Sequence, residues 1–212
     1  MQLAVSPQLP SQAGIRSAEI LASVRQTFVE KGFDGASMQD LARAAKMSVG
    51  NFYRYFPSKA AIIQALILHD AAVMQRDFAM ILASPDPLAG LRHGIHGRVM
   101  NAECAKDMSL WTEIEAASRR SPEIAAAAQR MEAEVCGNFL AVFAAETQLT
   151  AEEANRRFSA LASFIFVMVK AASCLSCGSA LDQAEVRSMI LRSIDHSLDN
   201  VVVVARTRQK SA

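Results

Sequence analysis

The sequence predicts an all-α fold, and three observations favour it. Of its 212 residues, 51% are hydrophobic but only 6% are aromatic, and stretches rich in Ala, Leu, Met, Glu and Arg favour helix over strand. Apolar residues recur at helical spacing in successive segments. Runs of β-branched residues are rare outside residues 201–204.

The first predicted helix follows a short tail. Residues 1–11 contain two prolines and little periodicity, so we expect a flexible tail there. From about Ser11 a helix is expected, because Ile20, Val24 and Phe28 recur one turn apart. It should end at Gly32, since glycine readily adopts the left-handed conformation that closes a helix.

Serines mark the starts of the next three predicted helices, because a serine hydroxyl can accept a hydrogen bond from a free N–H group of the first turn. Ser37 opens a short second helix, with Asp40 favouring its positive end. Ser48 opens a short third helix. Ser58 opens a long fourth helix, whose apolar spacing continues to about residue 83.

A break at residues 84–87, with two prolines, precedes five further predicted helices. Pro122 fits the first turn of one of them, where its missing N–H costs nothing. Thr150 and Glu153 form a capping box for another. The expected ranges are 87–104, 107–119, 122–147, 151–177 and 182–204.

Charge and composition indicate what kind of partner the protein binds and where in the cell it works. The net charge is +1, but residues 1–60 hold seven Lys and Arg against four Asp and Glu, a net of +3, which is compatible with an anionic partner. No secretory signal is visible, and the longest apolar run, 160–169, is too short to span a bilayer. We expect a cytoplasmic protein whose four cysteines are reduced.

The densest aromatic cluster lies in MSVGNFYRYFPSK, residues 47–59. Two short helices joined by a turn form a helix-turn-helix, whose second helix enters the major groove of DNA. Phe52 and Phe56 are four residues apart and should share the inward face. Tyr53 and Tyr55 can reach outward, where a phenol hydroxyl is a rigid donor to a phosphate oxygen.

The span ILASVRQTFVEKGFDGASMQDLARAAKMSVGNFYRYFPSKAAIIQALI resembles the DNA-binding region of TetR/AcrR-type regulators. The matching elements are F-x-E-x-G-F, S-x-x-D-L-A-x-x-A, S-x-G-N-F-Y-x-Y-F and the following P-S-K, and the match covers residues 15–67. The resemblance implies phosphate anchors at Tyr53, Tyr55 and Lys59. It places the family's usual DNA contacts at Ser37, Ser48, Gly50, Asn51, Tyr53, Tyr55 and Lys59.

Other positions of this region bear on base preference. Arg54 and Asn51 are placed to read base edges, since Arg can pair with guanine and Asn with adenine. Lys46 stands where the family usually has a glycine; a left-handed lysine costs about 1 kcal/mol but adds a charge near DNA. Val49 replaces a polar residue and could touch a thymine methyl group. The predicted DNA contacts are Ser37, Lys46, Ser48, Val49, Gly50, Asn51, Tyr53, Arg54, Tyr55 and Lys59.

The rest of the chain should form a helical bundle. Residues 158–177 are apolar on nearly every face, so they must be covered on all sides. The family resemblance implies that the last two helices, about 151–177 and 182–204, pair across a two-fold axis. The resulting homodimer would present two recognition helices to a palindromic operator.

Such a bundle can hold a small, largely apolar effector, because methionines and aromatics form an adaptable apolar surface. For any single residue, ordinary core packing is the alternative. Glu113, Glu115 and Arg119 or Arg130 could orient a polar ligand group. The candidate lining residues are Met74, Met108, Trp111, Phe139, Phe143, Phe164 and Met168.

Two other patterns suggest chemistry only weakly. Cys174 and Cys177 form a CxxC, but it ends an apolar helix and has no βαβ pattern around it, so small core residues are the favoured interpretation. His93 and His96 are separated by a helix-weakening glycine, and we expect no metal site there. No phosphate loop or catalytic motif appears, so we expect neither an enzyme nor a cofactor.

We therefore predict a flexible tail at 1–11, a three-helix helix-turn-helix DNA-binding domain at 12–57, a ligand-binding and dimerisation domain at 58–205, and a basic tail at 206–212. The expected function is a ligand-responsive transcriptional regulator, with repression implied by the resemblance. A ligand would move the long fourth helix and change the spacing of the recognition helices. The alternatives are a redox- or metal-sensing regulator using Cys174 and Cys177, and a constitutive DNA-binding protein with a filled core.

Overall fold

The computed structural model describes residues 12–100, 102–173, 175 and 180–209, and these form nine α-helices and no strand. The predicted all-α fold is confirmed. The helices are α1 Gln12–Gly35, α2 Met38–Ala44, α3 Val49–Tyr55, α4 Lys59–Ala83, α5 Pro87–Met100, α6 Ala102–Ser118, α7 Pro122–Thr147, α8 Ala151–Ser173 and α9 Ala180–Gln209.

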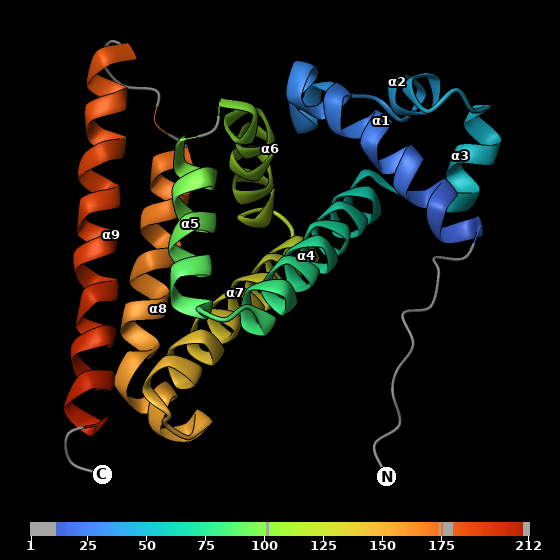
Figure 1. Ribbon diagram of the computed structural model, residues 1–212. Helices are drawn as coiled ribbons and strands as arrows, with labels where there is room; N and C mark the ends of the chain where they lie inside the picture. Colours follow the sequence, from blue (N-terminus) through green and yellow to red (C-terminus); the bar gives the residue numbers. More distant parts are fainter. Residues whose placement is uncertain (1–11, 101, 174, 176–179, 210–212) are drawn as a thin grey trace, which may run out of the picture.

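The long helix α4 connects the two ends of the molecule. In Figure 1, α1 to α3 gather around its first turns, and its far end lies among the helices of the bundle. The helices α8 and α9 stand side by side at the edge of the bundle that lies away from α1 to α3 (Figure 1). The chain therefore places its helix-turn-helix and its last two helices at opposite ends.

The predicted serine caps are confirmed. The hydroxyls of Ser37, Ser48 and Ser58 accept hydrogen bonds from backbone N–H groups three residues later, at 3.1, 3.3 and 3.1 Å. The start of α8 has the predicted capping box, in which Glu153 Oε2 lies 2.9 Å from the Thr150 nitrogen. Short-range chemistry thus sets where these helices begin.

Other helix ends differ from the predicted ranges. The helix α5 ends at Met100 rather than 104, and α6 begins at Ala102 rather than 107. The helix α8 is described to Ser173, and residues 174, 176 and 177 of its predicted range lie outside the described residues. The helix α9 extends past both predicted ends, from Ala180 to Gln209. Most of the added residues are good helix formers, namely Ala, Leu, Arg and Gln, so they extend the helix although they add little apolar periodicity.

The glycine at the end of α1 makes a kink rather than a stop. Gly32 has a φ of 69° and a ψ of 167°, so its φ is positive as predicted, but its ψ is extended and not that of the left-handed helical conformation. Helical geometry then resumes for a short turn, which ends at Gly35. The chain changes direction at Gly32 just before the helix-turn-helix begins.

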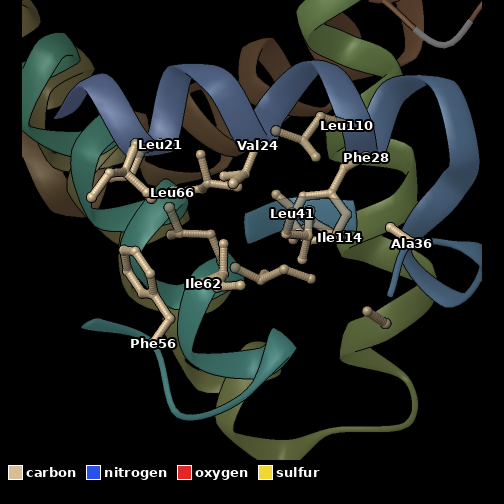
Figure 2. Close-up of a cluster of buried hydrophobic side chains, with 14 of the residues drawn as sticks. Leu21, Val24, Phe28, Ala36, Leu41, Phe56, Ile62, Leu66, Leu110 and Ile114 are labelled. Carbon is tan, nitrogen blue, oxygen red and sulfur yellow. The ribbon is translucent and has the colours of Figure 1, made fainter. Parts of the chain in front are cut away.

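Two groups of buried side chains hold the molecule together. The first joins α1 to α4 with α6 and the first half of α7, and Figure 2 shows Leu110 and Ile114 of α6 lying close to Phe28 and Leu41. The second joins the far part of α4 with α5, α7, α8 and α9. Burying each large apolar side chain contributes about 1.5–3 kcal/mol, so α6 is a substantial part of the packing around the helix-turn-helix.

Replacing Lys46 by glycine should stabilise the protein. Lys46 has a φ of 53° in the turn between α2 and α3, where a side chain is strained. We expect Lys46→Gly to raise the free energy of unfolding by about 1 kcal/mol, measured by urea denaturation. Lys46→Ala is the matched control, because it removes the charge but keeps the strain. Equal stability of the two variants would contradict a strained turn.

Candidate nucleic-acid interface and ligand cavity

The short helix α3 has one buried and one exposed face. Phe52 and Phe56 are 0% and 6% exposed, and their ring centroids lie 5.6 Å apart. The prediction that both belong to the core is confirmed. The exposed residues of α3 and of the turn before it are Lys46, Ser48, Val49, Gly50, Asn51, Tyr53, Arg54 and Tyr55.

Two exposed tyrosines and a glycine without close neighbours lie on the exposed face of α3. Tyr53 and Tyr55 are each 46% exposed, which is high for large aromatic residues. A Cβ atom added at Gly50 would meet nothing within 4 Å among the described residues. The fold therefore does not need glycine there, and the missing side chain leaves room for a partner to approach the α3 backbone.

A polar network fixes α2 to the end of α1. The Ser37 hydroxyl donates to Asp40 Oδ2 at 2.6 Å, and Lys31 Nζ lies 2.8 Å from Asp40 Oδ1. The Lys31 ammonium, followed by the hydroxyl and backbone N–H of Ser37, holds the pKa of Asp40 well below its usual value. Ser37 is therefore exposed but already engaged as a cap.

Lys59 has a structural role that the sequence did not indicate. Its half-buried side chain turns toward the end of α1, where Nζ donates to the carbonyl oxygens of Phe33 at 2.8 Å and Asp34 at 3.2 Å. The same ammonium lies 4.9 Å from the centroid of the Phe33 ring. A phosphate contact at Lys59 would have to compete with these three interactions.

The helix α6 holds the kink of α1 from the other side. Glu113 Oε2 accepts a hydrogen bond from the Phe33 N–H at 2.7 Å, and Arg120 pairs with Asp34 at 2.8 Å. A Cβ atom added at Gly32 would lie 3.4 Å from Glu113 Oε2. Glu113, which the sequence suggested as a ligand-orienting group, instead anchors the helix-turn-helix to the bundle.

A cavity of about 590 Å³ lies in the bundle, lined by residues of α4, α5, α6, α7 and α8. Of the predicted lining residues, Met74, Trp111 and Phe139 contribute to its wall. The Met108 side chain lies outside the described residues. The cavity wall therefore contains three of the seven predicted lining residues.

Three predicted lining residues do not line this cavity, so the prediction that they form its wall is wrong. Phe143 is fully buried, with its ring centroid 5.7 Å from that of Phe158. Phe164 is 40% exposed on the outer face of α8. Met168 packs against the second core instead. The neighbouring Phe166 takes the place at the cavity wall.

Charged side chains also line the cavity. Lys170 of α8 forms an ion pair with Glu115 of α6, which is the only one of the suggested polar residues that reaches the cavity wall among those described. Arg98, Asp77 and Glu132 are the other charged lining residues, and no pattern in the sequence indicated them. A lysine that directly follows the apolar run 160–169 was the available signal for Lys170.

The remaining candidate groups form no further site in the described part of the chain. Within it, no three His, Cys, Asp or Glu side chains are grouped as metal ligands would be. His96 Nε2 instead lies 2.9 Å from Asp195 Oδ2. Cys174 and Cys177 lie outside the residues whose side chains are described. The described helices include none that is long and apolar enough to cross a membrane.

Sequence comparisons place the N-terminal part among known regulators. Residues 20–66 match the family model described as bacterial regulatory proteins, tetR family. The chain is 32% identical over 123 residues to the HTH-type transcriptional regulator UidR of Escherichia coli strain K12, covering 56% of this chain and 59% of that protein. It is 39% identical over 82 residues to EthR of Mycolicibacterium smegmatis, covering 38% of each chain. The chain thus matches less than two thirds of the length of these relatives, and both are named as transcriptional regulators.

Solved structures extend the likeness of fold to most of the chain. Salmonella enterica GusR aligns with a TM-score of 0.67 and 21% identity, over 89% of this chain and 98% of that one. AibR, solved in complex with isovaleryl coenzyme A and operator DNA, aligns with a TM-score of 0.59 and 14% identity, over 83% and 96% of the two chains. At these identities the likeness concerns the fold alone.

Neutralising Asp40 should remove a pH-dependent contribution to stability. The pKa of Asp40 is lowered in the folded state, so its contribution is full above the unfolded value of about 4 and is lost as the pH falls below it. We expect the stability difference between wild type and Asp40→Asn to be largest near neutral pH and to shrink in acid. Urea denaturation at several pH values measures it. Glu134→Gln, an exposed change in the middle of α7, is the control, and a pH-independent difference at Asp40 would contradict the lowered pKa.

Removing the carboxylate of Glu113 should loosen the kink of α1. Glu113→Ala leaves the half-buried Phe33 N–H without its acceptor, which costs about 1–3 kcal/mol. We expect a lower unfolding free energy and faster hydrogen exchange at the Phe33 amide. Glu113→Gln keeps an acceptor oxygen, so its free energy of unfolding should fall much less. An equal fall in the two variants would argue against this hydrogen bond.

Proposed function

Because the chain belongs to the TetR family of bacterial regulatory proteins, we propose that it is a DNA-binding transcriptional regulator that responds to a small ligand, most simply as a repressor. The observation that carries the proposal is the two-sided character of α3. Its buried phenylalanines fix the helix in the core, while its exposed face presents phenols, an amide, a guanidinium and a bare glycine.

Each exposed group has a distinct role in this proposal. The Tyr53 and Tyr55 hydroxyls donate to phosphate oxygens, and Gly50 lets the α3 backbone come close to the DNA. Arg54 and Asn51 read base edges in the major groove. Val49 contacts a thymine methyl group, and Ser37, Lys46, Ser48 and Lys59 lie at the helix ends and turn that flank the phosphate backbone.

Lys59 has a second role besides DNA binding, since its ammonium already holds the end of α1. We infer that it serves the interface mainly by positioning the helix-turn-helix. The exposed Lys46, in the strained turn, is the better-placed flanking cation. Variants of Lys59 are therefore unsuitable for testing phosphate contacts, because they would also disturb the fold.

A homodimer through α8 and α9 fits the outer face of the bundle. Large apolar residues are exposed on both helices: Phe164 at 40%, Val167 at 55%, Met189 at 54% and Val203 at 59%. A second copy would cover them and would present two α3 helices to one palindromic operator in the cytoplasm. The exposure of these residues, in helices otherwise packed into the second core, supports this assembly.

The cavity supports an effector that acts through α4 and α6. The first turns of α4 pack in the core of the helix-turn-helix, while Met74, Phe78 and Ile81 of the same helix line the cavity. A ligand that binds the cavity better in one arrangement of α4 would shift the population toward it and alter the spacing of the two recognition helices. Release from the operator then follows from this difference in affinity.

The alternatives have less support. A constitutive DNA-binding protein with a filled core would not be expected to carry a cavity of about 590 Å³, a size within the range of ligand sites, about 300–1,000 Å³. A sensor based on Cys174 and Cys177 has no support from any described residue, since both side chains lie outside the described part.

Selection from a random pool of double-stranded DNA tests the proposal without knowledge of the operator. We expect the protein to enrich a two-fold symmetric sequence, bound with an affinity that falls steeply with salt. Enrichment of an asymmetric sequence would contradict binding as a symmetric homodimer. Failure to enrich any sequence would overturn sequence-specific DNA binding.

The selected DNA then allows a test of the phenols. Tyr53→Phe and Tyr55→Phe remove only a hydroxyl from an exposed ring, so the fold should be retained. Losing a hydrogen bond to a charged phosphate costs about 1.5–3 kcal/mol, and we expect each variant to bind at least roughly tenfold more weakly in fluorescence anisotropy. Arg130→Gln, an exposed change on α7, is the control. Unchanged affinity in the double variant would contradict the phosphate contacts.

A further inference from the structure

We propose that the cavity selects effectors with an apolar body and a single carboxylate head, and that this head replaces Glu115 as the partner of Lys170. The inference rests on the proposed function, because it assumes that the cavity is the effector site. It goes further by naming the chemistry that the effector must carry and the ion pair that it must break.

The apolar part of the effector is indicated by the cavity wall. Trp111, Phe139, Phe78, Met131 and Phe166 all line it, from four different helices. Phe78, Met131 and Phe139 are buried, so the part of the wall that they form is screened from bulk solvent. An aliphatic or aromatic body is the ligand part that such a wall binds best, because it removes apolar surface from water.

The sign of the head group follows from which charges lie deeper. The two lining cations, Lys170 and Arg98, are half-buried, whereas the three lining acids, Asp77, Glu115 and Glu132, are exposed. Lys170 directly follows Val169 and lies one turn after Phe166, and both of these residues line the cavity. The lysine stem therefore belongs to the apolar wall, with its ammonium group at the edge.

The ion pair with Glu115 indicates that the Lys170 ammonium group is best accommodated beside an anion. A half-buried ammonium is disfavoured without a partner, and in this structure Glu115 supplies the carboxylate. The side chains of Lys170 and Glu115 are 37% and 46% exposed, and pairs this open to solvent contribute little stability. A ligand carboxylate can therefore replace Glu115 at small cost.

The opposite choice of head group is less favourable. A ligand amine that paired with Glu115 would leave the half-buried Lys170 without its carboxylate partner. A ligand carboxylate that paired with Lys170 would instead release Glu115, the more exposed member of the pair, into water. A neutral head would displace neither group and would form no ion pair of its own, so it would be held less strongly than a carboxylate.

The exchange would also reach the DNA-binding end of the molecule. Glu115 and Lys170 join α6 to α8 across the cavity, and Glu113, two residues earlier, holds the Phe33 N–H at the kink of α1. Releasing Glu115 from Lys170 frees the cavity side of α6 while its other side stays attached to α1. The head group would therefore act on the helix that supports the kink.

Trp111 makes a direct test possible, because it is the only tryptophan in the chain and it lines the cavity. The probes are three straight-chain series of matched length, from six to ten carbons: carboxylates, primary alcohols and primary amines. We expect carboxylates to change the Trp111 fluorescence at concentrations at least about tenfold lower than the matched alcohols, and amines to bind more weakly than either.

Variants of the ion pair then assign the preference. Lys170→Met should remove the preference for carboxylates while leaving alcohol binding unchanged, which also shows that the cavity is intact. Glu115→Gln removes the competing carboxylate and should tighten carboxylate binding several-fold. Arg156→Met, an exposed change near the start of α8 that does not line the cavity, is the control for charge in general and should leave all three series unaffected.

Three results would overturn the proposal: alcohols or amines binding as tightly as carboxylates, a carboxylate preference that survives Lys170→Met, or no response of Trp111 to any carboxylate at millimolar concentration. DNA affinity is measured on the same preparations without probes. Retained operator binding with any of these results would reject the carboxylate head while leaving DNA binding intact, so the two proposals fail separately.

Discussion

The arrangement of this protein depends on one shared apolar core, in which the helix-turn-helix packs against α4 and α6. The helix α3 has only seven residues, and an isolated helix of that length is not stable in water. Its position is set by Phe52 and Phe56, which are buried in the same cluster as Phe28 of α1 and Ile114 of α6. Its exposed face is therefore fixed by side chains on the opposite face.

Polar contacts concentrate where this core meets the kink of α1. Between Lys31 and Asp34, Lys31 pairs with Asp40, the Phe33 N–H donates to Glu113, and the Phe33 and Asp34 carbonyls accept from Lys59. These contacts tie α1 to α2, α6 and α4. The cavity is lined by Met74, Phe78 and Ile81 near the other end of α4 and by residues of α6 that include Ile114, so both helices can carry a change at the cavity to the helix-turn-helix.

Much of the fold was predictable because its signals are local. The caps at Ser37, Ser48 and Ser58 each act within three residues, and the positive φ at Gly32 follows from its residue type. The partners of Lys59 and Glu113 were not predictable, since they lie 26 and 80 residues away along the chain. The same holds for the cavity wall: Phe164 and Phe166 look alike in sequence, and only the packing of α8 decides which one faces inward.

The shared core also limits how such regulators can be recombined. A fragment that ended at residue 57 would lose Ile62, Ile63 and Leu66 of α4, together with Leu110 and Ile114 of α6, all of which are at most 1% exposed. The remaining three helices would expose the apolar surface that these residues cover. To exchange DNA specificity between relatives, one should therefore replace exposed residues of α3 in an intact chain. Joining the N-terminal helices of one protein to the helical bundle of another would break this core.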